Sequence, residues 1–303
     1  MADLSVKVCG VEFKNPIIPA SGVFGYGREY AQYYDLSRLG GIAAKGTTPK
    51  KQNGNPAPRI AETPAGILNS VGLQNPGMDA FLAEELPWLM KQNTVILANF
   101  AGSSPELCAE SAAKLDKTDV HMLELNISCP NVKNGGLAFG ADPKTAANMV
   151  KAVRAATKKP LVVKLSPNVT DITAIAKAVE AEGADAVSLI NTLLGMRIDL
   201  RTRRPILRNN TGGLSGPAVF PVAVRMVWQV ANAVQIPVIG MGGVQSGKDA
   251  AELMMAGASA VQVGTAIVAD PYAPLRIIDE LNNWLDENGI ATAAELTKTV
   301  KAW

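Results

Sequence analysis

Eight short apolar runs, spread along 303 residues, constrain the fold of this chain more than any other feature. Runs that are apolar throughout, rather than alternating with polar residues, are typical of parallel strands buried on both faces. The sequence therefore predicts a parallel sheet. In chain order the runs are Pro16–Ala20, Gly41–Lys45, Thr94–Asn99, Met122–Asn126, Pro160–Ser166, Ala186–Asn191, Ile236–Gly240 and Ala260–Gly264.

Amphipathic helical patterns separate many of these runs, for example Pro143–Thr157, Asp171–Glu182, Pro217–Val234 and Lys248–Ala256. Glycine follows two of the patterns directly, as is usual after the last turn of a helix. Eight strand–helix units predict an α/β fold of the (β/α)8 TIM-barrel type. The competing doubly wound sheet is disfavoured, because no G-x-G-x-x-G motif follows the first run.

Two kinds of addition to the barrel are expected. Val6–Val8 and Val11–Phe13 flank a Cys-Gly turn and predict a small N-terminal β-hairpin. The connections Thr47–Pro76 and Thr192–Gly216 are longer than a barrel needs, and we interpret them as inserted active-site loops. Barrels of this length often form one domain, so residues 1–303 are expected to be a single domain.

Composition excludes several classes of function. The net charge is only +2, which argues against nucleic acid as the main partner. A single histidine, His121, excludes mechanisms that need a histidine dyad or a Ser-His-Asp triad. No apolar run approaches the length of a membrane span and the first residues do not resemble a signal peptide, so a cytoplasmic location is expected.

The cysteines Cys9, Cys108 and Cys129 lie far apart in the sequence. An odd number without paired spacing does not predict a disulfide framework. Since there is no C-x-x-C motif, we expect no metal site and no iron–sulfur cluster held by this chain alone.

Polar residues gather where the apolar runs end. Lysines (Lys45, Lys164) and asparagines (Asn99, Asn126, Asn191) stand at these ends, and the C-terminal ends of barrel strands carry the active site. A Schiff-base lysine and a counter-charge for a reduced flavin both remain open for the lysines.

The last two runs end in glycine turns, which predict a phosphate site. Met241–Gly243 and Gly264–Thr265 would let backbone N–H groups approach an anion. The helix start at Ser246–Lys248 is expected to add its dipole.

The most reactive stretch follows the fourth run, where Asn126, Ser128, Cys129 and Asn131 crowd into six residues. This stretch, with the segments that follow, resembles dihydroorotate dehydrogenases of class 1. The similarity covers nearly the whole chain, and the segment with Lys133 looks like class 1B. It rests on Asn126–Lys133, Gly135–Gly136, Phe139–Gly140, Asn15–Gly25, Lys45–Thr48, Gly54–Pro56, Pro58–Arg59, Asn69–Asn75, Met241–Gly243 and Val263–Thr265.

The resemblance implies an FMN flavoprotein that oxidises dihydroorotate to orotate in de novo pyrimidine (UMP) biosynthesis. A hydride leaves C6 for FMN N5, and Cys129 is the base for the C5 proton. It implies FMN contacts from Ala20, Ser21, Lys45, Gly46, Asn99, Asn126, Lys164, Ile190, Gly216, Gly242, Gly243, Gly264 and Thr265. It implies substrate contacts from Lys45, Asn69, Val71, Gly72, Leu73, Asn126, Asn191 and Thr192.

Class 1B also implies a partner subunit that carries FAD and a [2Fe–2S] cluster and passes electrons to NAD. A homodimer within a heterotetramer is the expected assembly. A further hypothesis makes Pro130–Gly136 a mobile loop that closes Cys129 over the substrate.

Other interpretations stay open at this point. The same chemistry in a stand-alone, fumarate-dependent class 1A enzyme is the nearest one. A lysine aldolase, a barrel that binds a phosphorylated ligand without redox work, and a regulatory or scaffold barrel are the others.

Overall fold

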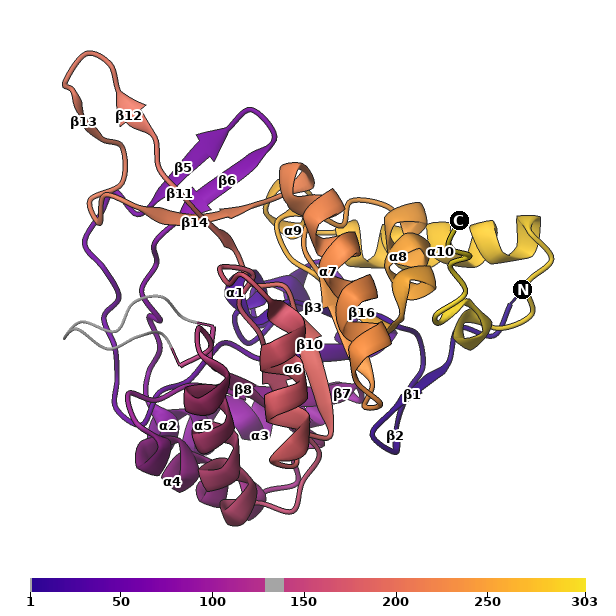
Figure 1. Ribbon diagram of the computed structural model, residues 1–303, viewed down its shortest axis with the longest axis horizontal. Coiled ribbons are helices and arrows are strands. Elements are labelled where there is room, and N and C mark those ends of the chain that lie inside the picture. The colour runs from indigo at the N-terminus through magenta and orange to yellow at the C-terminus, as the bar shows by residue number, and fades with distance from the viewer. Residues whose placement is uncertain (1, 129–138) are drawn as a thin grey trace.

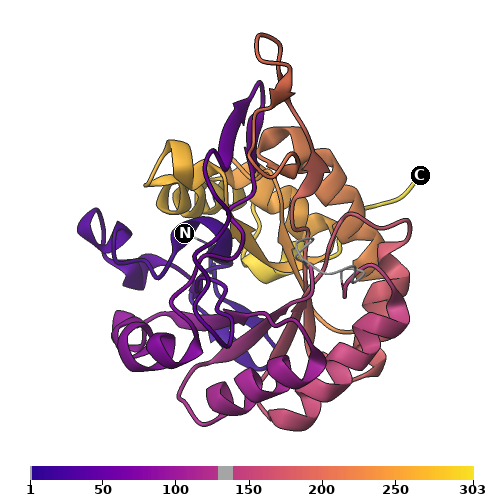
Figure 2. The same cartoon turned by 90° about the vertical axis from the view of Figure 1, so that its left-hand side faces the viewer.

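A barrel of eight parallel strands forms the centre of the computed structural model, which describes residues 2–128 and 139–303. The strand order is β3-β16-β15-β10-β9-β8-β7-β4. Barrel strands that follow one another along the chain are therefore neighbours in the sheet. Gly40 N donates to Ile17 O (3.1 Å) between the two end strands and brings the ring to closure. The predicted (β/α)8 barrel is confirmed (Figure 2). The strands are β3 (Ile17–Pro19), β4 (Gly41–Ala43), β7 (Val95–Phe100), β8 (Met122–Asn126), β9 (Leu161–Lys164), β10 (Ala186–Leu189), β15 (Val238–Met241) and β16 (Ala258–Val263).

Long helices surround the barrel (Figure 1). They are α4 (Pro105–Asp116), α5 (Pro143–Ala156), α6 (Ile172–Ala181), α7 (Phe220–Ala233), α8 (Gly247–Ala256) and α10 (Ala273–Glu287). The predicted bounds of α6 include its two caps: Asp171 accepts from Thr173 N (2.9 Å), and Glu182 stands at the C-terminal cap. The amphipathic pattern therefore predicted the position of this helix correctly, and the predicted bounds exceed the observed ones only by the two capping residues.

Shorter helical segments replace long helices beside β3 and β4. They are α1 (Ser21–Phe24), η1 (Tyr30–Gln32), η2 (Leu36–Arg38), α2 (Met78–Ala80), η3 (Phe81–Glu85), α3 (Leu86–Leu89) and η4 (Met90–Gln92). The other short segments are η5 (Pro217–Val219), α9 (Ala266–Ala269) and η6 (Ala293–Leu296). The helix predicted over Pro217–Val234 thus begins as the 3-10 turn η5 before α7.

The predicted N-terminal hairpin is present as β1 (Val6–Val8) and β2 (Val11–Phe13), paired antiparallel. Val8 and Phe13 are fully buried, and Cys9 Sγ lies 3.1 Å from Asp185 O, just before β10 begins. The hairpin therefore covers the N-terminal end of the barrel strands and leaves the other end for the site.

The two long connections, predicted as inserted active-site loops, contain strands and line the cavity described below. They supply a four-stranded antiparallel sheet of order β11-β14-β6-β5 and a second hairpin, both of which project from the barrel (Figure 1). The strands are β5 (Ile60–Thr63), β6 (Gly66–Asn69), β11 (Leu193–Gly195), β12 (Ile198–Asp199), β13 (Arg204–Pro205) and β14 (Gly212–Ser215). Because β6 pairs with β14, a partner far along the chain, local sequence patterns did not reveal this sheet.

Apolar side chains from the strands and the surrounding helices form the core. All six positions of β7 are buried, including the polar Asn99. Among the described residues, no helix is both long and apolar enough to cross a membrane.

Candidate active site

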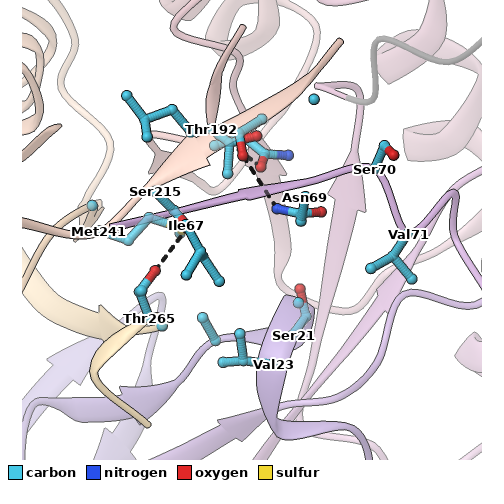
Figure 3. A pocket seen from close by; sticks show the side chains of 18 of the residues that line it. Ser21, Val23, Ile67, Asn69, Ser70, Val71, Thr192, Ser215, Met241 and Thr265 are labelled. Atoms are coloured by element: carbon cyan, nitrogen blue, oxygen red, sulfur yellow. Dashed lines mark hydrogen bonds between the residues drawn. The ribbon is translucent and has the colours of Figure 1, made fainter. Parts of the chain in front are cut away.

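A cavity of about 550 Å³ opens at the C-terminal ends of the barrel strands, beneath the four-stranded sheet (Figure 3). Every residue expected to contact cofactor or substrate lines it, apart from Gly216 and Cys129. These are Ala20, Ser21, Lys45, Gly46, Asn69, Val71, Gly72, Leu73, Asn99, Asn126, Lys164, Ile190, Asn191, Thr192, Gly242, Gly243, Gly264 and Thr265. Cys129 and the segment Pro130–Gly136 lie outside the described residues.

The glycine turn after β15 forms one wall of the cavity. Gly242 and Gly243 have φ of +124° and +79°, values that side-chain-bearing residues rarely adopt. A Cβ on Gly243 would lie 2.8 Å from Gly216 O and from Phe220 N. Gly216 therefore packs against this turn; it is not among the residues that line the cavity, and its contact with the cofactor stays a prediction.

The expected role of the α8 start is also corrected. Asp249 Oδ2 accepts from Gln245 N (2.8 Å) and Ser246 N (2.9 Å), and Glu280 Oε2 accepts from Gly247 N (2.7 Å). Because carboxylates of the chain itself use these N–H groups, the α8 terminus is closed to an external phosphate. Thr265, whose hydroxyl lies 2.8 Å from Ser215 Oγ (Figure 3), lines the cavity instead.

Two lysines bring positive charge to the cavity. Lys164 is on β9 and only 5% exposed, beside Asn126 in the β8–β9 register. Lys45 follows β4, and both residues line the cavity. Since burying an ammonium group costs free energy unless a negative group meets it, the buried Lys164 favours an anionic ligand.

Asn126, Ser128 and Asn191 form a hydrogen-bonded chain. Asn191 Nδ2 donates to Ser128 Oγ (2.5 Å), and Ser128 Oγ donates to Asn126 Oδ1 (2.6 Å). Ser128 N also donates to Asn126 Oδ1 (3.1 Å). Because Ser128 occupies the amide oxygen, Asn126 offers its NH2 group to a ligand, which suits a carbonyl or carboxylate oxygen.

A buried carboxylate lies beneath the cavity. Glu124 on β8 is fully buried, and its Oε2 accepts from Asn99 Nδ2 (2.6 Å). Its Oε1 accepts from Ser188 Oγ (2.8 Å) and Gln262 Nε2 (2.7 Å). The remaining amide oxygens, Asn99 Oδ1 and Gln262 Oε1, are buried and have no partner among the described residues.

The segment Asn69–Leu73 forms the side of the cavity below the projecting sheet. Asn75, 5% exposed, holds it: Nδ2 donates to Leu73 O (2.7 Å) and Thr48 Oγ1 (2.8 Å). Its Oδ1 accepts from Thr48 N (3.1 Å) and Gly77 N (2.9 Å). One amide thus joins this segment to the chain that follows β4.

Neither of the other two cysteines, Cys9 and Cys108, is among the residues that line this cavity. Burial raises the pKa of the Cys108 thiol to about 12, and burial with the nearby Asp185 carboxylate raises that of Cys9 to about 12. Both therefore remain protonated at neutral pH and cannot serve as a base. His121 Nδ1 accepts from Ile96 N (3.1 Å) at the opposite end of the strands.

Comparison with known proteins identifies the family. The family model for dihydroorotate dehydrogenase matches residues 3–285. The chain belongs to the dihydroorotate dehydrogenase family. This confirms the resemblance found in its motifs.

Several relatives of this dihydroorotate dehydrogenase family member share the name "Dihydroorotate dehydrogenase B (NAD(+)), catalytic subunit". The protein of Pelobacter propionicus is 56% identical over 295 residues, 97% of each chain. That of Geobacter metallireducens is 58% identical over 295 residues, again 97% of each chain. That of Enterococcus faecalis is 56% identical over 300 residues, 98% of this chain and 96% of its own.

Some residues of the site were missed by the sequence interpretation. Glu124 and Gln262 are polar positions inside otherwise apolar runs, a signal that could have singled them out. Ile67 and Ser215 also line the cavity, but nothing local in the sequence distinguishes them. Among the described residues, no cluster of three or more His, Cys, Asp or Glu could hold a metal ion.

Proposed function

We propose that this chain is the catalytic subunit of a class B dihydroorotate dehydrogenase, which oxidises dihydroorotate to orotate in pyrimidine biosynthesis. One observation carries the proposal. A single cavity joins glycine turns suited to a phosphate, two lysines, and amides suited to a pyrimidine ring. The names of relatives at 56–58% identity support the same assignment.

The donor set fits FMN. Gly242, Gly243, Gly264 and Thr265 would hold its phosphate, because glycine turns let backbone N–H groups approach an anion. Lys164 would meet the ring, where a cation stabilises added negative charge. When bound, FMN supplies the acceptor, its N5 atom, for the hydride that leaves C6 of dihydroorotate.

The substrate would lie against Asn126, Asn191 and the Asn69–Leu73 segment. The hydrogen-bonded chain through Ser128 orients Asn126 to donate to a ring carbonyl or to the carboxylate. Lys45 lines the same cavity and would neutralise the carboxylate of dihydroorotate.

Cys129 is the proposed base. Its thiolate takes the proton from C5 of dihydroorotate, and the C5–H electron pair forms the C5–C6 double bond as the hydride departs from C6. Cys129 directly follows Ser128, which the hydrogen bonds to Asn126 and Asn191 hold in place. The high pKa values of Cys9 and Cys108 support this choice among the three thiols.

Electrons would leave through a second subunit that carries FAD and a [2Fe–2S] cluster and reduces NAD. The words "NAD(+)" and "catalytic subunit" in the names of the relatives support an arrangement in which this chain oxidises the substrate and a second subunit reduces NAD. A homodimer of this chain joined to two such partners completes the proposed heterotetramer.

The test starts from the purified chain alone. We expect an oxidised-flavin absorbance spectrum that dihydroorotate bleaches in the absence of oxygen, and reoxidation by NAD only after the partner subunit is added. A colourless chain that reconstitution with FMN leaves colourless would overturn the proposal. Rapid reoxidation by fumarate without a partner would favour the stand-alone class 1A alternative.

A further inference from the structure

Glu124 lies at the axis of the barrel. Its strand β8 is separated from β16 by three strands in either direction around the ring. Even so, Glu124 Oε1 accepts a hydrogen bond from Gln262 on β16 (2.7 Å). With Asn99 on β7 and Ser188 on β10, donors from three strands meet at this one carboxylate.

The Glu124 carboxylate fixes the orientation of the Asn99 and Gln262 side-chain amides. A carboxylate accepts hydrogen bonds and does not donate them, so Asn99 and Gln262 must direct their NH2 groups toward Glu124. Their oxygens therefore point away from it. Both oxygens are buried without a partner among the described residues, and both side chains belong to the cavity lining.

Gly46 lies close to one of these oxygens, Asn99 Oδ1. A Cβ at this position would lie 2.7 Å from Asn99 Oδ1 and would displace the amide. Gly46 itself lines the cavity. A buried carbonyl oxygen without a hydrogen bond is costly, so a pair of them at a cavity floor points to a ligand that donates N–H groups.

We infer that Glu124 is a positioning residue: through Asn99 and Gln262 it sets the cavity floor to accept a hydrogen bond from the N3–H group of the flavin. The inference rests on the proposed FMN site. Oxidised FMN has one ring N–H, at N3, between two carbonyl groups. An acceptor oxygen of the floor suits this N–H group, and the Lys164 cation suits a carbonyl oxygen beside it.

The test compares FMN with 3-methyl-FMN, which lacks the N3–H donor. Both are titrated into flavin-free protein, with quenching of flavin fluorescence as the readout. We expect the wild type to bind FMN about thirtyfold more tightly, as for a buried acceptor left unpaired by the methylated ring.

Glu124→Gln keeps the size of the side chain but adds an NH2 donor, so Asn99 or Gln262 can turn over. We expect the preference for FMN to fall to about threefold or less. Glu287→Gln, the same change at an exposed position on α10, should keep the full preference. A purely structural role for Glu124 would weaken both flavins equally and leave their ratio unchanged.

Each failure has its own signature. A full preference for FMN in Glu124→Gln, or equal binding of both flavins by the wild type, overturns the inference and leaves the proposed function standing. A wild type that binds neither flavin overturns the proposed function and the inference with it. If Glu124→Gln does not fold, Gln262→Met removes one acceptor oxygen directly, and an unchanged preference in that variant overturns the inference.

Discussion

At the scale of single residues, local partners decide what each amide offers to a ligand. Ser128 occupies the oxygen of Asn126, so that residue presents N–H groups. Glu124 occupies the NH2 group of Asn99, so that residue presents an oxygen. Two asparagines at neighbouring strand ends thus have opposite hydrogen-bonding character, which suits a site that holds two different rings.

Replacement of the Cys129 thiol tests the assigned base. Cys129→Ser should retain bound FMN but lose at least about 100-fold in the rate of flavin reduction, because a positioned base contributes 10²–10⁴-fold. In the wild type that rate should rise about tenfold per pH unit up to a pKa of about 8.5, as the thiolate fraction grows.

The matched control is Cys108→Ser. Burial raises the pKa of Cys108 to about 12, so this thiol stays protonated over the same pH range, and we expect its removal to leave the pH profile unchanged. Flavin reduction at the wild-type rate in Cys129→Ala would exclude Cys129 as the base.

At the scale of elements, the barrel strands deliver the polar groups and the inserted strands cover them. The ends of β7, β8 and β9 supply Asn99, Asn126 and Lys164. The insertions after β4 and β10 meet as neighbouring strands β6 and β14, with Asn69 Nδ2 donating to Gly213 O (3.5 Å; Figure 3). The floor and the cover of the site therefore come from different sheets.

Asn75 joins the substrate-side segment Asn69–Leu73 to the chain that follows β4. Its replacement should therefore weaken the binding of substrate more than the binding of FMN. Asn75→Ala deletes the bonds that hold Leu73 and Thr48, so the substrate-side segment loses its fixed shape. We expect KM for dihydroorotate to rise about tenfold, which corresponds to about 1.4 kcal/mol of lost binding. The dissociation constant of FMN, measured by fluorescence, should stay within about threefold.

Asn283→Ala, at an exposed position on α10, serves as the matched control and should change neither constant. Equal weakening of FMN and dihydroorotate by Asn75→Ala would show that Asn75 supports the whole cavity rather than one side of it.

At the scale of the whole molecule, closure of the barrel brings distant strands into one site. The central carboxylate meets Asn99 on the neighbouring strand β7, but it meets Gln262 on β16, across the barrel, because the sheet closes into a ring. Closure depends on the approach of β3 to β4, where Gly40 N donates to Ile17 O (3.1 Å). There is no room for a side chain at this point: a Cβ on Gly40 would lie 1.9 Å from Asn15 O.

Gly40→Ala should therefore destabilise the fold, by about 3 kcal/mol, since the backbone at Asn15 has to move. Denaturant unfolding followed by circular dichroism measures this change. Gly22→Ala, where no atom lies within 4 Å of the added Cβ, should change the free energy of unfolding by less than about 1 kcal/mol. Equal stability of Gly40→Ala and the wild type would contradict the closure argument.

The barrel was predictable from the sequence because its signals are local. Apolar runs such as Met122–Asn126 and capped helices such as α6 are specified by neighbouring residues, and their bounds agree closely with the structure. Strand ends in a parallel barrel share one face, so Lys45, Lys164 and the asparagines could be grouped before any coordinates were known.

The tertiary structure alone decided the sheet of β5, β6, β11 and β14, the occupied terminus of α8 and the network around Glu124. Each depends on groups that are distant in sequence. A residue's type determines whether it can donate or accept a hydrogen bond, but only the closed barrel determines which partner lies within reach. Hence the apolar run from Met122 predicted a strand. The hydrogen-bond partners of Glu124, at the centre of that strand, lie on three other strands and were visible only in the folded barrel.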